Sequence, residues 1–277
     1  MGMRIATNVA SLNAQKVMVT NSREMQKSLA QLSTGSRITK AGDDAAGLAI
    51  SENLKGQIRS YGQAARNAND GISMIQTAEQ SMGEVSNMLT RLRELGIQAA
   101  SDTIGEQERG FINKEVDAMK SEIQRVAESA SFGSRKLLDG TGGVYDIHVG
   151  TQSAENTDWI AFDSSQTDVT LNTLGIADLD FTSKEGARAG LTQLDQAQGS
   201  VNGSRANLGA LQNRLASGSD VINTMVESLN AANSRIRDTD VAASTSELAR
   251  NNVLMQGTTA TLAQANQIPQ MALKLIG

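Results

Sequence analysis

Apolar residues recur at intervals of three and four over most of the chain. The longest series runs from Leu54 to Ile75 and, after a polar interruption at Glu79, resumes from Met82 to Leu92. This spacing places an apolar stripe on one face of an α-helix. It predicts a single helix of nearly fifty residues, about 75 Å long at ~1.5 Å per residue. A helix of that length is typical of a multi-helix coiled coil and not of a globular core.

Two further helices continue this spacing. The break at "SDTIGE" contains Thr103 and Glu106 in the order of a capping box, which predicts the start of a second helix that folds back along the first. That helix carries a stripe formed by Ile112, Val116, Met119, Ile123 and Val126. A third helical series, from Leu191 to Ile236, has its apolar positions at Leu191, Leu194, Val201, Leu208, Leu211, Leu215, Ile222, Met225, Leu229, Ala232 and Ile236.

Between these helices the pattern changes to short strands and turns. "VYDIHV" and "DWIAFD" predict two strands, and "DVTL" a possible third, within an insert at about 141–184. The predicted fold is therefore mainly α: a long antiparallel α-helical coiled-coil bundle with a small β-hairpin insert.

The two ends of the chain are also helical in pattern but carry little charge. Val241, Leu248, Met255 and Leu262 recur at every seventh residue after a pause at "RDTD". Apolar positions near the other end are Ile5, Val9, Leu12, Leu29 and Leu32. Isolated helices of this kind are marginal in water, so each end is expected to pair with the other terminus or with another subunit.

Composition excludes several classes of function. The 277 residues include no cysteine, which rules out disulfides and thiolate metal sites, and only 3% are aromatic. The net charge of −5 has its basic residues scattered, so we expect no nucleic-acid partner. The longest apolar run, Ala45–Ile50, is far short of a membrane span, and no signal peptide is recognisable. The chain is expected to be cytoplasmic or to leave the cell without a cleaved signal.

Candidate catalytic groups are few. His148 is the only histidine, in a predicted strand, and no phosphate-binding or hydrolase motif occurs. Adjacent carboxylates at Asp43 and Asp44 lack further ligands at metal-site spacing, and we interpret them as a helix cap at a joint between helices. No enzyme activity and no cofactor are predicted.

Four motifs resemble bacterial flagellin. They are "LSTGSRITKAGDDAAGLAIS" near the start, "FGSRKLLDG" midway, and "SRIRDTDVA" and "LAQANQIPQMALKLI" at the end. They cover both terminal thirds of the chain in the family's order. The resemblance implies a structural subunit that assembles into the flagellar filament for swimming motility, with the β-hairpin insert in place of large outer domains.

The resemblance also implies a division of the chain. Residues 1–44 with 238–277 would be terminal helices of the filament's inner core, and 45–237 a rod domain. The core helices would bring the apolar residues of both ends into the assembly interface. The connectors between the two domains would contain Arg37, Ile38, Asp43, Asp44, Arg237 and Asp238.

Partners follow from the same resemblance. They are further copies of the chain, an export chaperone, and the cap and hook-junction proteins, with export through the flagellar type III apparatus to an extracellular filament. Recognition by a host innate-immune receptor would use Arg91, Leu95 and Glu115. Two alternatives stay open at this point: a hook–filament junction protein, which shares the terminal pattern, and a signalling coiled coil.

Overall fold

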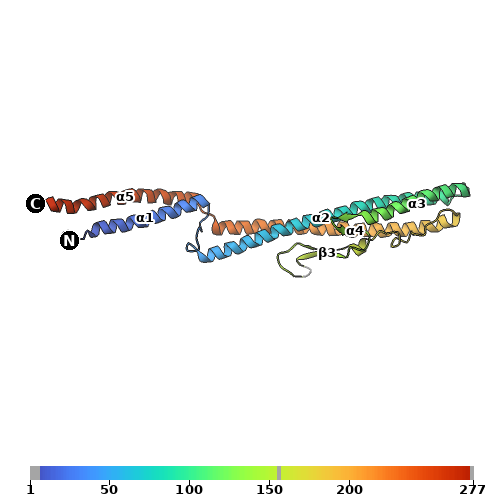
Figure 1. The fold of residues 1–277 in the computed structure, drawn as a ribbon, viewed down its shortest axis with the longest axis horizontal. Helices are drawn as coiled ribbons and strands as arrows, with labels where there is room; N and C mark the ends of the chain where they lie inside the picture. The colour runs from blue at the N-terminus through green and yellow to red at the C-terminus, as the bar shows by residue number, and fades with distance from the viewer. Residues whose placement is uncertain (1–6, 155–156, 275–277) are drawn as a thin grey trace. The chain divides into compact units, whose positions relative to one another are not determined.

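A computed structural model describes residues 7–154 and 157–274 (Figure 1). The chain divides into a terminal unit, residues 1–56 and 228–277, and a central unit, residues 57–227. The predicted boundaries at 44 and 238 lie in the loops that adjoin the long helices, about ten residues from the bounds of these units. The terminal unit therefore includes the first turns of the helix that begins at Ala45 and the last turns of the helix that ends at Arg237. In this region Arg237 hydrogen-bonds Ser51 and forms an ion pair with Glu52.

The terminal unit contains a pair of helices, α1 (Val9–Thr34) and α5 (Val241–Lys274). They lie side by side in Figure 1, with the start of α1 and the end of α5 at the same end of the pair. The Asn8 carboxamide caps α1 by accepting from the Ser11 N–H at 3.1 Å. Gly35 ends that helix with a φ of +67°, a left-handed conformation that glycine adopts at little cost.

Three long helices form the central unit: parts of α2 (Ala45–Ala99) and α4 (Lys184–Arg237), and the whole of α3 (Glu106–Ser129). At 55 residues, α2 is slightly longer than predicted. The antiparallel course of α2 and α4 brings Glu79 to Arg205, with 2.7 Å between Oε1 and Nη2. The polar interruption in the stripe of α2 is therefore an ion-pair position.

The predicted stripes of these helices meet in one core. Its fully buried members include Ile75, Met82, Val85, Leu92, Val116, Ile123, Val201, Leu208 and Leu215. Most of the α4 series is buried or half-buried, but Met225 is 42% exposed, which corrects its assignment to the seam. The last buried residue of α4 is Ile222, about one turn before Met225, at 5% exposure.

The turn between α2 and α3 differs from the prediction. The capping box does not form: Gly105 is the N-cap of α3 and no side chain caps it. Instead the buried Arg109 donates from Nε to the Ala99 carbonyl at 2.8 Å and from Nη2 to the Ser101 carbonyl at 2.9 Å. One guanidinium thus satisfies carbonyl groups that the end of α2 leaves without helical partners.

Two hairpins lie between α3 and α4. The first pairs β1 (Ser131–Phe132) with β2 (Arg135–Lys136), and the second pairs β3 (Val144–His148) with β4 (Trp159–Asp163) in antiparallel register. The inward side chains of the second hairpin are those of Ile147, Ile160 and Phe162, which are all buried.

The possible third strand at 168–171 is wrong. This segment is not a strand, and it follows the 3-10 turn η1 (Ser164–Thr167). Asp168 accepts a hydrogen bond from the Thr170 N–H at 2.9 Å, a local turn that competes with extended pairing.

Candidate assembly surface

The seam between α1 and α5 is polar. Buried side chains on these two helices include those of Ser11, Ser28, Ser244 and Thr258. The Asn21 amide donates to Thr258 Oγ1 at 3.2 Å, and the Ser11 hydroxyl donates to Asn266 Oδ1 at 3.0 Å. Small hydroxyl and amide groups therefore set the register of this helix pair. Ala265 is the one buried apolar residue among those described on α1 and α5, and the larger apolar side chains are at most half-buried.

Large aliphatic side chains of the same helices point to solvent instead. Those exposed by about half or more are Val9, Leu12, Val17, Val19, Leu29, Val241, Val253 and Leu254. Val253 has the largest exposed fraction, 68%. So many exposed large aliphatic side chains on one helix pair favour an interaction surface.

The predicted interface residues divide between these two environments. Val9, Leu12, Leu29 and Val241 are exposed, whereas Leu32, Leu248, Met255 and Leu262 are half-buried. Ile5 lies outside the described residues. Val17, Val19, Val253 and Leu254 were not predicted. Val253 and Leu254 fall outside the seven-residue series that contains Val241 and Leu248, whereas Val19 lies seven residues after Leu12. A search for a second apolar face on helices with few charges would have found them.

The predicted connector residues come together within the terminal unit. Arg37 donates from Nη2 to the Ile236 carbonyl at 2.7 Å, and its backbone N–H donates to the Arg237 carbonyl at 2.6 Å. A β-bridge joins Ser36 to Asp238. Ile38 is buried, at 2% exposure. The two crossings between terminal and long helices are thus hydrogen-bonded to each other.

Asp44 caps α2, as predicted for this pair of carboxylates, whereas Asp43 accepts hydrogen bonds from the loop before it. Asp44 accepts from the Gly47 N–H at 2.8 Å in the first turn of α2. Asp43 accepts from the Thr39 hydroxyl at 2.9 Å and from the backbone N–H groups of Thr39 and Lys40. The hydroxyl bond is the main reason that the pKa of Asp43 is lowered. No group of carboxylates and imidazole with metal-site geometry occurs among the described residues.

The predicted receptor patch is only partly at the surface. Arg91 is exposed and bonds Glu94 Oε2 at 2.9 Å and Glu115 Oε1 at 3.0 Å, and these bonds raise its pKa. Leu95 is 2% exposed and belongs to the core. Its inclusion as a surface contact is therefore corrected: Leu95 continues the buried stripe, while Arg91 and Glu115 lie beside it on the outside.

His148 is exposed on β3, with its ring centroid 6.1 Å from that of Trp159. It has no neighbouring acid or nucleophile in a hydrogen bond with its ring among the described residues.

In the part of the chain that the structure describes, no helix is long and apolar enough to cross a membrane.

Comparison with known proteins bears on both ends of the chain. The bacterial flagellin N-terminal helical region matches residues 5–142, and the bacterial flagellin C-terminal helical region matches residues 191–276. A flagellin of Halalkalibacterium halodurans is 41% identical over 274 residues, which cover 99% of this chain and all of the relative. A flagellin of Bacillus subtilis is 38% identical, with coverage of 99% and 100%.

Solved structures agree on the fold. The crystal structure of Bacillus cereus flagellin superposes with a TM-score of 0.51 at 28% identity, covering 56% of this chain and 88% of that one. A putative flagellar hook-associated protein from Vibrio parahaemolyticus has a TM-score of 0.57 at 15% identity, with coverage of 71% and 100%, which shows a shared fold alone. Because both family regions match and full-length relatives exceed 30% identity, the chain belongs to the bacterial flagellins, structural subunits that self-assemble into the extracellular filament for motility.

Proposed function

We propose that the outward aliphatic faces of α1 and α5 are the surface by which copies of this chain join in the filament. The observation that carries the proposal is the polarity of this helix pair: serine and threonine are buried at its seam, while all the described valines and several leucines are exposed and the remaining leucines are only half-buried. Burying such side chains between subunits supplies the hydrophobic stabilisation that the seam lacks.

Folding of the ends and polymerisation are therefore coupled. A helix pair with a polar seam and exposed apolar faces gains most of its stability from neighbouring copies. The central unit does not depend on this gain, because its own seam buries Met82, Leu92 and Leu208 almost completely.

A truncation tests the coupling. Deleting residues from Val241 onward should leave the central helices folded by circular dichroism and abolish filaments in seeded assembly. Full-length chain, treated identically, should gain helix on polymerising. The coupling is wrong if the truncated chain still forms filaments, or if full-length helicity is the same before and after assembly.

The hydrogen-bonded crossings serve as the connector between the assembling ends and the central helices. Arg37 and Arg237 hold the two crossings to each other through backbone carbonyls and Glu52. Export through the flagellar type III apparatus, and contacts with a chaperone, the cap and hook-junction proteins, complete the proposal. We further propose that the chain has no catalytic role.

A second proposal concerns Arg91 and Glu115 as contacts for a vertebrate innate-immune receptor. Both are exposed, and their ion pair joins α2 to α3. In a reporter-cell assay Arg91→Ala should weaken signalling. Arg125→Ala is the matched control, because Arg125 is an exposed arginine of α3 that pairs with Glu122. Equal signalling by both variants would argue against a role for Arg91.

A further inference from the structure

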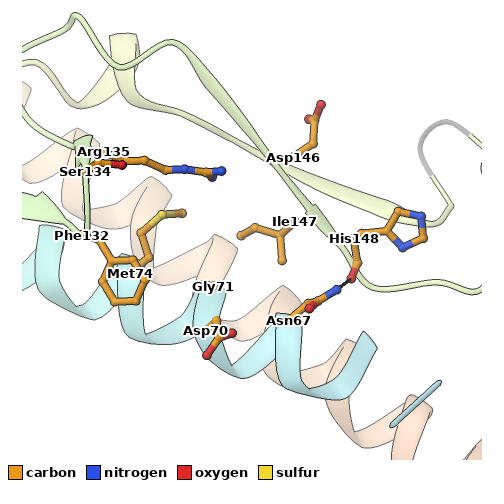
Figure 2. Close-up of a pocket in the computed structure, with 11 residues that line it drawn as sticks. Asn67, Asp70, Gly71, Met74, Phe132, Ser134, Arg135, Asp146, Ile147 and His148 are labelled. Carbon is orange, nitrogen blue, oxygen red and sulfur yellow. Dashed lines mark hydrogen bonds between the residues drawn. The ribbon is translucent and has the colours of Figure 1, made fainter. Parts of the chain in front are cut away.

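A hollow of about 500 Å³ lies in the central unit between α2 and the two hairpins (Figure 2). Its apolar surface comes from Met74, Ile147 and Phe132. Ile147 approaches α2 closely because residue 71 is glycine: a Cβ there would lie 2.6 Å from Ile147 Cδ1. The Asn67 amide donates to the His148 carbonyl at 3.0 Å and ties β3 to the helix. The hollow is therefore held open by ordered elements.

Charged side chains surround this apolar surface. Asp70 and Asp146 lie on opposite walls, on α2 and β3, and Arg135 extends from β2 into the space between them (Figure 2). All three are exposed. None of them forms an ion pair with another described residue. The hollow thus offers two carboxylates without an ion-pair partner, and an arginine whose guanidinium lies over the Tyr145 ring at 5.0 Å from its centroid, to an occupant that carries an apolar group.

Elsewhere on the central unit, an exposed aromatic ring lies between a basic and an acidic side chain that could pair with the charged groups of the hollow. Phe111 is 59% exposed on α3, and the Lys114 ammonium lies 5.6 Å from its ring centroid. Glu108 precedes Phe111 by one turn and is also exposed. An acid, an aromatic ring and a base therefore follow one another at intervals of three on this helix.

Phe111 cannot fill the hollow of its own chain. The bonds from Arg109 to the Ala99 carbonyl and from Arg91 to Glu115 place Phe111 beside α2 near residue 97. The hollow adjoins α2 at residues 67–74. At ~1.5 Å per residue these places are roughly 35 Å apart along the helix.

We propose that the hollow is a docking site for Phe111 of a second copy of this chain. The ring lies against Met74 and Ile147, Lys114 faces the two carboxylates, and Glu108 faces Arg135. The proposal rests on the self-assembly described above and names a second contact for it, on the central unit. A projection and a hollow at different places on one subunit make a heterologous contact, which repeats into an open polymer when the rotation does not close.

Cross-linking in assembled filaments tests this contact. The chain has no cysteine, so Lys114→Cys with Asp146→Cys introduces the only two thiols. A short bifunctional maleimide should join them between subunits and give a ladder of dimers, trimers and higher species on a denaturing gel. Because Glu115 pairs with Arg91, Lys114 lies near residue 92 of α2, roughly 27 Å or more along the helix from the hollow, and this distance prevents internal closure by a short linker. The control pair, Lys114→Cys with Asp220→Cys, replaces an exposed carboxylate of α4 and should give no ladder.

Filaments that contain the test pair and yield no ladder would overturn the docking site without touching the assembly role of α1 and α5. If the test pair elongates poorly by itself, copolymerisation with an excess of unaltered chain keeps filaments intact. Cross-linked dimer between single variants, one with Lys114→Cys and one with Asp146→Cys, is then expected, and its absence refutes the contact. Failure of the unaltered chain to polymerise at all would instead count against the proposed function.

Discussion

Replacing one outward valine of α5 should weaken assembly without changing the folded subunit. Val253 is the most exposed large aliphatic residue, at 68%. Serine and valine have similar helix propensities, so Val253→Ser changes the intrinsic stability of α5 very little. The substitution removes apolar surface that contributes to stability only when a neighbouring subunit covers it.

The expected magnitude follows from the exposed fraction. Full burial of a valine side chain contributes about 1.5–3 kcal/mol, and 68% of it corresponds to roughly 1–2 kcal/mol per subunit added. Since about 1.4 kcal/mol is a tenfold change in an equilibrium constant, the critical concentration for polymerisation should rise roughly fivefold to thirtyfold.

Sedimentation of seeded filaments over a range of subunit concentrations measures this change directly. Asn252→Ser is the matched control, because it alters the neighbouring exposed position without removing aliphatic surface. The thermal unfolding of the central unit should be the same in both variants. A critical concentration for Val253→Ser equal to that of the control would refute the assignment of this face to assembly.

Three further outcomes are expected. Leu208→Ala leaves a cavity in the central core, where this side chain is 1% exposed, and should lower the free energy of unfolding by about 2–5 kcal/mol in urea titration. Arg109→Met leaves the carbonyls at the end of α2 unpaired, at a cost of about 1–3 kcal/mol, with faster amide exchange localised to that turn. The pKa of Asp43 is lowered, chiefly by the Thr39 hydroxyl, so its stabilisation is complete above its unfolded value of 3.8 and is lost as pH falls through the lower folded value. Amide exchange in residues 37–44 should accelerate below that pH in the unaltered chain, whereas Asp43→Asn should show the faster exchange already at neutral pH and little further change.

The long helices could be predicted because their stripes are long and regular. The series through Leu89 and Leu92 on α2 and through Leu208 and Leu215 on α4 are buried as expected, since period and burial agree over many turns. The helix cap at Asp44 and both strands of the larger hairpin could also be predicted from residue types close to them in the sequence. A local motif failed to predict the turn between α2 and α3. The expected capping box does not form there, and Arg109 of α3 hydrogen-bonds the Ala99 carbonyl at the end of α2.

The assembly surface was only partly predictable. A heptad search found positions that turn out to be half-buried, such as Leu248, and missed Val253, because both faces of α5 carry apolar residues and no single period separates them. Leu95 shows the opposite difficulty. It belongs to the receptor patch predicted from the resemblance, yet its side chain completes a buried stripe, which depends on the packing of α2 against its neighbours.

The two units differ in which side chains they bury, and therefore in what their stability depends on. The central unit buries aliphatic side chains within one subunit, so its stability does not depend on subunit concentration. The terminal unit buries hydroxyl and amide groups and exposes its valines and several leucines, so under the proposed assembly role its stability would rise with the concentration of free subunits and of filament ends. A more apolar seam between α1 and α5 would stabilise the free subunit but would remove side chains from the surface that neighbouring copies cover. The polar seam, with hydrogen bonds such as that between Asn21 and Thr258, sets helix register at little cost in apolar surface. Under the proposed assembly role, polymerisation therefore depends on a helix pair that is only marginally stable until neighbouring copies cover its exposed valines and leucines.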